Sequence, residues 1–233
     1  MPIFELSKEI QFPDPELADP SGILAVGGDL SPQRLLQAYQ TGVFPWFNEG
    51  DPIVWWSPDP RTVLYPAEVK VSQSMRKVLR DKTFTVTLDR DFAAVITQCK
   101  VQKRVGQKGT WITQEMLDAY VLLHEQGYAH SVEVWKENAL VGGLYGVSLG
   151  GFFAGESMFS KTTNASKVAF ITLARLLEKL SFTMLDCQIY TKHLASLGAR
   201  EISRELYLEE LNRSLQQTTL KGSWGKMNLL DAG

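Results

Sequence analysis

The order of apolar and polar positions divides the first half of the chain into short helices and strands. A helix is predicted to start at Ser31-Pro32 and to stop at Gly42, because serine is a favoured N-cap and proline suits the first helical position. Apolar positions at helical spacing predict three more helices, and alternation predicts a strand. In chain order, the elements are a short strand or extended segment at 21–28, the helix from Ser31, a helix at 72–80, a strand at 84–88, a helix after Asp91 and a helix from Thr113 to Gly127.

The second half changes to a strand pattern at residue 130. Three segments joined by tight turns, HSVEVW, ALVGGLYGVSL and FFAGESMFS, predict an antiparallel meander. Asn164 is predicted to cap a long helix, a strand follows at 184–190, and a last helix begins near Ser203. The final fifteen or so residues have little pattern, so we expect them to be loosely attached. This order of elements resembles the acetyltransferase-like α/β fold.

Composition fits one large globular domain or two modest ones. The chain has 233 residues, of which 44 % are hydrophobic. No apolar run reaches the roughly 20 residues of a membrane span, and the N-terminus lacks the pattern of a signal peptide. Cys99 and Cys187 lie far apart, and the three histidines show no metal-ligand spacing. We therefore expect a reducing, cytoplasmic location and no metal.

Charge is unevenly distributed, although the net charge is only −2. Residues 1–60 carry 2 Lys/Arg and 9 Asp/Glu, whereas residues 61–108 carry 11 and 4. The basic middle segment can bind a polyanion or can be a solvated helical face, and the charge alone does not decide between them.

An aromatic segment, FPWFNEGDPIVWWSPDPR, spans residues 44–61 and holds three of the six tryptophans and four prolines. A Trp in a Pro-rich loop either packs into a domain or stacks on a nucleobase, as in the recognition of RNA ends. We favour packing for Trp55 and Trp56, as a pin between two domains. We favour a site wall for Trp46 and for Trp111 further along the chain.

Acidic residues interrupt two apolar strands. By alternation, one face of the strand at 152–160 would carry Phe152, Ala154, Glu156, Met158 and Ser160, barring a bulge. Asp186 and Gln188 share one face of the strand at 184–190. Carboxylates are costly to bury unless paired, so these residues form either a structural polar network or a pocket for a cation or an amine. If the strands are neighbours, Glu156, Asp186 and Gln188 converge.

Several common catalytic motifs are missing. Ser157 lies in GESM rather than in a hydrolase elbow, and there is no P-loop or dinucleotide fingerprint. The segment SKTTNASKVA has no glycine where acetyltransferases bind coenzyme A, although its backbone amides could bind an anion.

A series of short motifs, in one order from about residue 6 to 212, closely resembles the bacterial leucyl/phenylalanyl-tRNA–protein transferases. The motifs are GGDLSPQRLLQAYQTGVFPWF, DPIVWWSPDPR, GTWIT, HSVEVW, LVGGLYGV, GESMFS, NASK, LDCQ and ASLGA. The likeness weakens in the last twenty residues and in the loop at 100–108.

The resemblance implies an activity and a fold. Such enzymes move Leu or Phe from aminoacyl-tRNA to the N-terminal Arg or Lys of a protein, which marks that protein for degradation, and they use no coenzyme A and no metal. The implied fold is a small N-terminal α+β domain, here residues 1–62, followed by an acetyltransferase-like domain with a mostly antiparallel sheet, residues 63–233. We expect a cytoplasmic enzyme.

The resemblance also implies roles for residues of this sequence. Asp186 and Gln188 would activate or position the attacking amine, and Glu156 would orient the acceptor. The terminal adenosine and aminoacyl group would contact Tyr39, Trp46, Trp111, Tyr120 and Ser160. The pocket for the transferred side chain would comprise Leu144, Met158, Phe170, Leu173, Leu177 and Leu185. In the basic segment, the tRNA arm would contact Arg76, Lys77, Arg80 and Lys82.

The pocket departs from similar proteins that carry Met or Phe at positions like 144, 173 and 177. These differences stay apolar, so the preference for large side chains unbranched at Cβ should hold.

Two other functions remain beside the transferase. One is a coenzyme A-dependent acyltransferase, against which the glycine-poor helix start argues. The other is a non-catalytic protein that binds RNA ends or basic N-termini.

Overall fold

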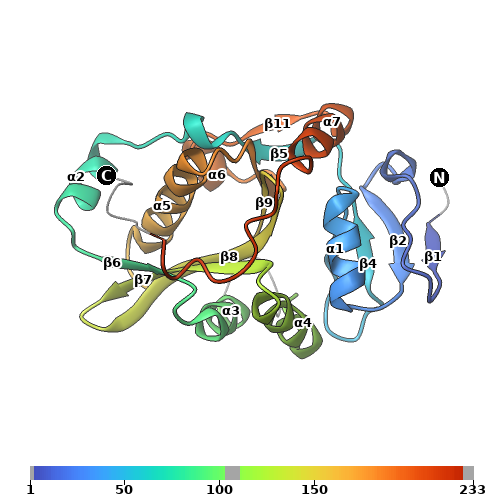
Figure 1. Ribbon diagram of the computed structural model, residues 1–233, viewed down its shortest axis with the longest axis horizontal. Coiled ribbons are helices and arrows are strands. Elements are labelled where there is room, and N and C mark those ends of the chain that lie inside the picture. The colour runs from blue at the N-terminus through green and yellow to red at the C-terminus, as the bar shows by residue number, and fades with distance from the viewer. Residues whose placement is uncertain (1–2, 103–110, 228–233) are drawn as a thin grey trace.

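The computed structural model describes residues 3–102 and 111–227 and contains two β-sheets with helices packed around them (Figure 1). The helices are α1 (Pro32–Gln40), α2 (Gln73–Arg80), α3 (Phe92–Val101), α4 (Gln114–Glu125), α5 (Ala165–Lys179), α6 (Lys192–Ser196) and α7 (Arg204–Ser214), with short 3-10 turns at Pro15–Leu17 and Pro66–Glu68. None of the helices in these two ranges is long and apolar enough to cross a membrane.

The small N-terminal sheet has the strand order β1-β2-β4-β3. Its strands are β1 (Phe4–Leu6), β2 (Ile23–Gly27), β3 (Phe44–Pro45) and β4 (Val54–Trp56). The aromatic segment supplies β3 and β4, which pair antiparallel. The Trp55 side chain is fully buried, and its Nε1 donates to the Gly27 carbonyl at 2.9 Å. Trp56 Nε1 donates to the Trp46 carbonyl. Both indoles therefore hydrogen-bond within the N-terminal unit. The expected packing of Trp55 is confirmed, and its ring belongs to an apolar cluster that continues into α3 and α4 of the larger unit.

The larger sheet has the order β11-β5-β10-β9-β8-β7-β6 and is antiparallel except between β9 and β10. Its strands are β5 (Arg61–Leu64), β6 (Thr85–Leu88), β7 (Ala129–Lys136), β8 (Ala139–Leu149), β9 (Phe152–Ser160), β10 (Met184–Gln188) and β11 (Arg200–Ile202). The predicted fold class, a small α+β unit followed by a mostly antiparallel sheet with helices, is confirmed. The expected boundary after residue 62 falls inside β5, which pairs with the larger sheet.

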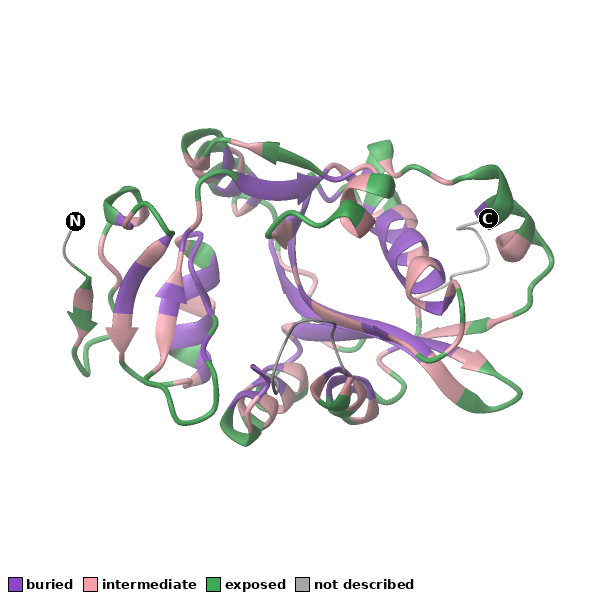
Figure 2. Cartoon of the chain, turned by 180° about the vertical axis from the view of Figure 1, so that it is seen from behind, coloured by how far each residue is buried: buried purple, intermediate pink, exposed green. Residues whose placement is uncertain are grey.

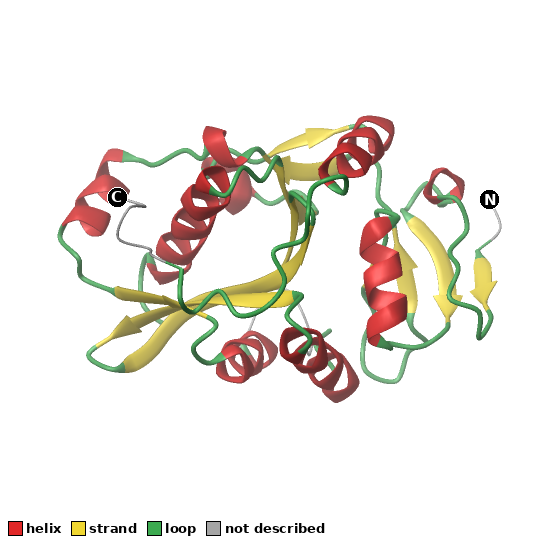
Figure 3. Ribbon diagram, viewed as in Figure 1, coloured by secondary structure: helices red, strands yellow, loops and turns green. Residues whose placement is uncertain are grey.

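Helices cover both faces of the larger sheet. In Figure 3, α5 lies on one face, and α3 and α4 lie on the other. Figure 2 shows that α5 and the central strands consist largely of buried residues. Side chains of Ser31, Ser72, Asp91, Thr113 and Ser203 cap helices as their sequence contexts suggest. The expected cap at Asn164 is wrong: this residue precedes α5 in a left-handed conformation, and its side chain makes no capping hydrogen bond.

A β-bulge changes which face the residues of β9 occupy. Tyr145 of β8 pairs with Ser157, whereas the next residue, Gly146, pairs with Gly155, so Glu156 is the extra residue. Consequently, Ala154 packs in the core beside α3 and α4, whereas Met158 packs against the core beside α5. The expectation of a single face from Phe152 to Ser160 is therefore wrong, because a bulge inverts the alternation at the acidic residue.

The segment after α7 is anchored rather than loosely attached, as far as residue 227. The Trp224 side chain is 1 % exposed and stacks on His130 at 3.9 Å between ring centroids. The Trp224 backbone N–H donates to Asp89 Oδ2 at 2.7 Å, and the same carboxylate contacts His130 Nδ1 at 2.9 Å. Burial lowers the pKa of His130, which keeps its ring neutral beside the indole at neutral pH. The expectation of loose attachment is therefore wrong for these residues.

Replacing Trp224 with alanine should lower the free energy of unfolding by about 3–5 kcal/mol, because a buried indole leaves a cavity. Urea denaturation followed by circular dichroism measures this change. Trp46→Ala is the matched control: the Trp46 side chain is 37 % exposed, so its loss should cost less than about 1 kcal/mol. Equal losses in the two variants would mean that Trp224 does not anchor the segment.

Candidate functional site

A cavity of about 430 Å³ lies where the N-terminal unit meets the central strands of the larger sheet. Its lining comes from β3, β8, β9, β10, α5 and α6, together with four residues outside these elements, Trp46, Trp111, Ile189 and Thr191. Most lining side chains are apolar, and Glu156, Gln188 and His193 are among the polar ones. Such a mostly apolar cavity with a few converging polar groups is typical of a small-ligand site. The residues that line it are Phe44, Pro45, Trp46, Trp111, Leu144, Tyr145, Gly155, Glu156, Ser157, Met158, Phe170, Leu173, Leu185, Asp186, Cys187, Gln188, Ile189, Thr191, His193 and Leu194.

Glu156 presents its carboxylate at the bulge of β9. Gln188 Nε2 donates to Glu156 Oε1 at 2.8 Å, and the Tyr120 hydroxyl donates to Oε2 at 3.0 Å. Burial raises the pKa of Glu156 to about 7, although the donors oppose this shift. A carboxyl group with such a pKa can both accept and return a proton near neutral pH.

Asp186 lies in a different environment, although it sits on the neighbouring strand. Its carboxylate forms a buried ion pair with Arg61, with Nε at 2.9 Å and Nη2 at 2.6 Å. The Tyr207 hydroxyl and the Gln188 backbone N–H also donate to it, at 3.2 and 2.8 Å. The Asp186 side chain is fully buried. The positive charge of Arg61 therefore compensates the charge of Asp186. The sequence left open whether the acids form a structural polar network or a binding pocket, and the structural network describes Asp186 better than it describes Glu156.

Arg61 connects this network to several parts of the fold. Its Nη1 donates to the Gly42 carbonyl at 3.3 Å, immediately after α1. Its guanidinium lies 4.7 Å from the centroid of the Phe44 ring and 4.5 Å from that of Tyr207. The guanidinium therefore joins the N-terminal unit, β5, β10 and α7 at one point.

The convergence expected from the two acidic strands is confirmed. β9 and β10 are parallel neighbours, with Ala154 opposite Asp186. Gln188 ends β10 with a positive φ of 62°, next to an irregularity in the pairing with β5. Its side chain reaches Glu156, and its N–H reaches Asp186. Gln188 thus links the two carboxylates.

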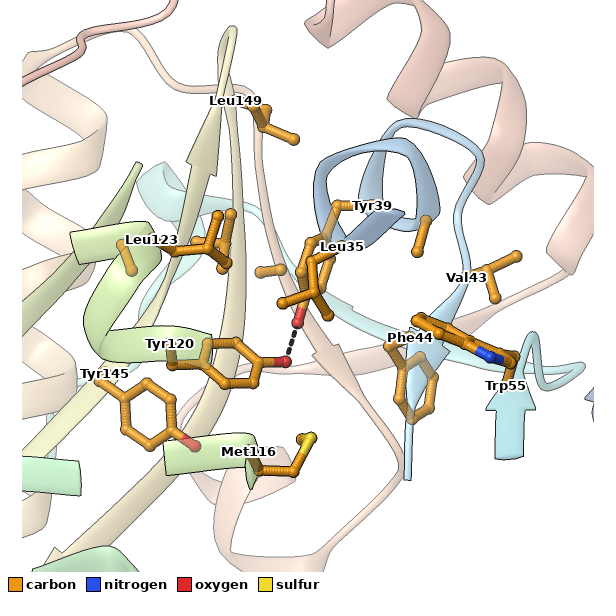
Figure 4. Packing of buried hydrophobic residues seen from close by; sticks show 14 of the residues in the cluster. Leu35, Tyr39, Val43, Phe44, Trp55, Met116, Tyr120, Leu123, Tyr145 and Leu149 are labelled. Carbon is orange, nitrogen blue, oxygen red and sulfur yellow. Dashed lines mark hydrogen bonds between the residues drawn. The ribbon is translucent and has the colours of Figure 1, made fainter. Parts of the chain in front are cut away.

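The aromatic candidates separate into two groups. Trp46 and Trp111 line the cavity, whereas Tyr39 and Tyr120 are buried behind Glu156 and are not among its lining residues. Their two hydroxyls face each other between α1 and α4 (Figure 4). Ser160 lies outside the lining and bonds to Thr162 O and to a backbone N–H of α5. The structure therefore brings two of these five side chains to the cavity.

The apolar candidates agree more closely with the cavity. Leu144, Met158, Phe170, Leu173 and Leu185 line it. Leu177 is fully buried in the core beside α5 and is not among the lining residues.

The basic candidates are exposed on α2 and just after it. The side chains of Arg76, Lys77, Arg80 and Lys82 are solvent-exposed, whereas Met75 packs inward. Helix α2 lies at the end of the molecule opposite the N-terminal sheet (Figure 1). Most of the basic loop expected at 100–109 lies outside the described residues.

Sequence reasoning missed Arg61, Tyr207 and His193. A fully buried aspartate in an apolar strand requires a cation, so an arginine closing the aromatic segment was an available clue to Arg61. No pattern indicated Tyr207 or His193, which reach the site from the helices α7 and α6. In the described ranges, no group of three or more His, Cys, Asp and Glu residues is arranged to hold a metal ion.

Comparisons with known proteins agree with the resemblance. Residues 63–212 match the family model described as leucyl/phenylalanyl-tRNA protein transferase, and residues 28–59 match the model of the N-terminal domain of the same family. Among solved structures, a remote likeness is to L-PGS from Bacillus licheniformis, with 12 % identity, a TM-score of 0.39 and coverage of 85 % of this chain and 66 % of that one.

Curated relatives are much more similar. The leucyl/phenylalanyl-tRNA–protein transferase of Syntrophus aciditrophicus is 59 % identical over 96 % of this chain and 94 % of its own length. That of Anaeromyxobacter sp. strain Fw109-5 is 54 % identical over 100 % of this chain and 97 % of its own. The chain therefore belongs to the leucyl/phenylalanyl-tRNA–protein transferase family.

Proposed function

We propose that the protein transfers Leu or Phe from aminoacyl-tRNA to the N-terminal Arg or Lys of acceptor proteins, and so marks them for degradation. Because charged tRNA is an intracellular substrate, we place this reaction in the cytoplasm. The observation that carries the proposal is one mostly apolar cavity containing a carboxyl group whose pKa is raised to about 7. The apolar part suits the transferred side chain, and the carboxyl group suits the attacking amine.

The apolar lining explains a preference for Leu and Phe. Leu144, Met158, Phe170, Leu173 and Leu185 give a wall without charged groups. An apolar pocket distinguishes poorly between apolar side chains, by roughly 1–3 kcal/mol per methylene. Use of both Leu and Phe is therefore the expected outcome. Trp46 and Trp111 would stack on the terminal adenosine, since indoles bind base faces.

The chemistry needs little beyond positioning and proton transfer, because the ester of aminoacyl-tRNA is already activated. The neutral α-amine attacks the ester carbonyl carbon, the amide bond forms, and the bond to the ribose oxygen breaks. Glu156 takes a proton from the amine and can return one to the leaving ribose oxygen. Before reaction, the ionised Glu156 attracts an acceptor that carries two positive charges, its α-ammonium group and its Arg or Lys side chain. The ammonium group releases one proton to solvent to become the neutral amine that attacks.

Asp186 and Gln188 would act by position. Arg61 compensates the Asp186 charge, so this carboxylate is a weak candidate for removing a proton. Asp186 instead holds the Gln188 backbone, and the Gln188 side chain holds Glu156. We therefore propose Glu156 as the catalytic base and the other two as residues that position it.

The two carboxylates should respond differently to neutralisation. Transfer of Leu from Leu-tRNA to a peptide beginning with Arg, measured by mass, should fall at least 100-fold in Glu156→Gln, with a thermal midpoint close to that of the unmodified protein. Asp186→Asn should lose both activity and stability, because Arg61 would remain buried without its partner, a change that typically costs about 3–5 kcal/mol.

An acetyl-blocked peptide is the control for the acceptor and should receive no Leu. Full activity of Glu156→Gln would exclude Glu156 as the base. Loss of activity without loss of stability in Asp186→Asn would return the chemical role to Asp186. Failure of the unmodified protein to transfer Leu or Phe would contradict the proposed function itself.

We propose that the tRNA backbone binds the exposed cations of α2 and of the turn that follows it. Phosphate contacts release counterions, so each one contributes about one to the slope of log affinity against log salt. Arg76, Lys77, Arg80 and Lys82 are exposed and close in sequence, which suits a phosphate backbone.

The double variant Arg76→Glu with Lys77→Glu reverses two of these charges and should weaken tRNA binding. It should also reduce the slope of log affinity against log salt concentration by about two. Filter binding at several salt concentrations measures both quantities. Lys8→Glu, on an exposed residue of the N-terminal unit, controls for net charge and should leave the slope unchanged. An unaltered slope in the double variant would exclude α2 from the tRNA interface.

A further inference from the structure

Two buried tyrosines lie directly behind the carboxyl group of Glu156. Tyr39 comes from α1 of the N-terminal unit, and Tyr120 comes from α4, which packs against α1. Their side chains are 1 % and 0 % exposed. In Figure 4 the two rings point their hydroxyls at each other across the boundary between the units.

The direction of these hydrogen bonds follows from counting protons. The Tyr120 hydroxyl has one proton and donates it to Glu156 Oε2 at 3.0 Å. It can then only accept from Tyr39, so Tyr39 donates to Tyr120. Burial raises the pKa of both phenols well above 10, so both retain their protons at neutral pH. The result is a chain of donors from Tyr39 through Tyr120 to Glu156.

A donor chain of this kind favours a charged acceptor at its end. A hydrogen bond to a carboxylate stabilises the ionised form, and a second donor polarises the first. Neither tyrosine lines the cavity, so this arrangement serves Glu156 from behind rather than the substrate.

We propose that Tyr39 and Tyr120 are positioning residues that keep Glu156 oriented and ionised, so that the site depends on the N-terminal unit being docked against α4. This inference rests on the proposed function for its catalytic meaning, but not for the hydrogen-bond chain itself. It also replaces the expected role of the two tyrosines as walls around the adenosine.

Other groups around Glu156 act on it as well. Asp186 on β10 opposes its ionisation, and Arg61 on β5 favours it. Gln188 on β10 donates to the other oxygen. Tyr145 of β8 packs edge-on against the Tyr120 ring and lines the cavity. A test must therefore change the tyrosine hydroxyls alone and leave these groups in place.

Substitution with phenylalanine removes each hydroxyl and keeps the ring. The titration of Glu156 is followed by NMR on protein labelled with [5-13C]glutamate, without substrates, and its resonance is assigned by comparison with Glu156→Gln. Tyr120→Phe should raise the titration midpoint by on the order of one pH unit. Tyr39→Phe should raise it in the same direction, because the Tyr39 hydroxyl also favours the ionised form of Glu156.

Tyr65→Phe is the matched control. The Tyr65 hydroxyl donates to Glu210, away from the cavity lining, so its removal should leave the Glu156 midpoint unchanged. Circular dichroism establishes that each variant is folded. Because Glu156 acts when ionised, the acid limb of the transfer rate should move to higher pH together with the NMR midpoint.

The two readouts separate this inference from the proposed function. An unchanged NMR midpoint in folded Tyr39→Phe and Tyr120→Phe would overturn the role of the tyrosines, whether or not the protein transfers Leu. If the midpoints shift but the protein has no transfer activity, the effect of the hydrogen-bond chain on Glu156 would stand. Its proposed role in the transfer reaction would then be overturned. Shifts in both the midpoint and the acid limb support the whole proposal.

Discussion

The structure depends most on the buried ion pair between Arg61 and Asp186. A buried guanidinium without its carboxylate typically costs about 3–5 kcal/mol, so the elements that contact the pair must keep their places. Arg61 also bonds to Gly42 of the N-terminal unit, and Tyr207 of α7 completes the network. By fixing the end of β10, the pair sets where Gln188 turns toward Glu156.

Glu156 and Asp186 look alike in the sequence, since each is an acid in an apolar strand. The structure gives them opposite surroundings. Asp186 accepts four hydrogen bonds, two of them from the cationic Arg61, whereas Glu156 accepts only from the neutral donors Tyr120 and Gln188. A carboxylate paired with a cation holds the structure together, whereas burial without a paired cation raises the pKa of Glu156 to about 7. Strand neighbours and a bulge decide between these outcomes, and neither is visible in periodicity.

Local patterns predicted most of the fold because they depend on nearby residues. Helix caps at Ser31 and Thr113 and the three strands of the meander follow from spacing of a few positions. The errors concern contacts between distant segments. The bulge at Glu156 inverts a face, and Trp224 is anchored by Asp89 from 135 positions away in the chain. The acids and Gln188 were found by strand alternation and most pocket residues by resemblance, whereas Arg61 and the placement of Tyr39 required the tertiary structure.

The N-terminal unit is part of the site rather than an appendage. Phe44, Pro45 and Trp46 line the cavity, Gly42 accepts from Arg61, and Tyr39 reaches toward Glu156 through Tyr120. A reaction between an activated ester and an amine gains its rate mainly from holding the two together. Because both units line the cavity, the cavity is complete only when the two units are packed against each other. The hydrogen bonds across their boundary therefore serve the same end as the cavity walls, since both fix the base and the substrates in one geometry.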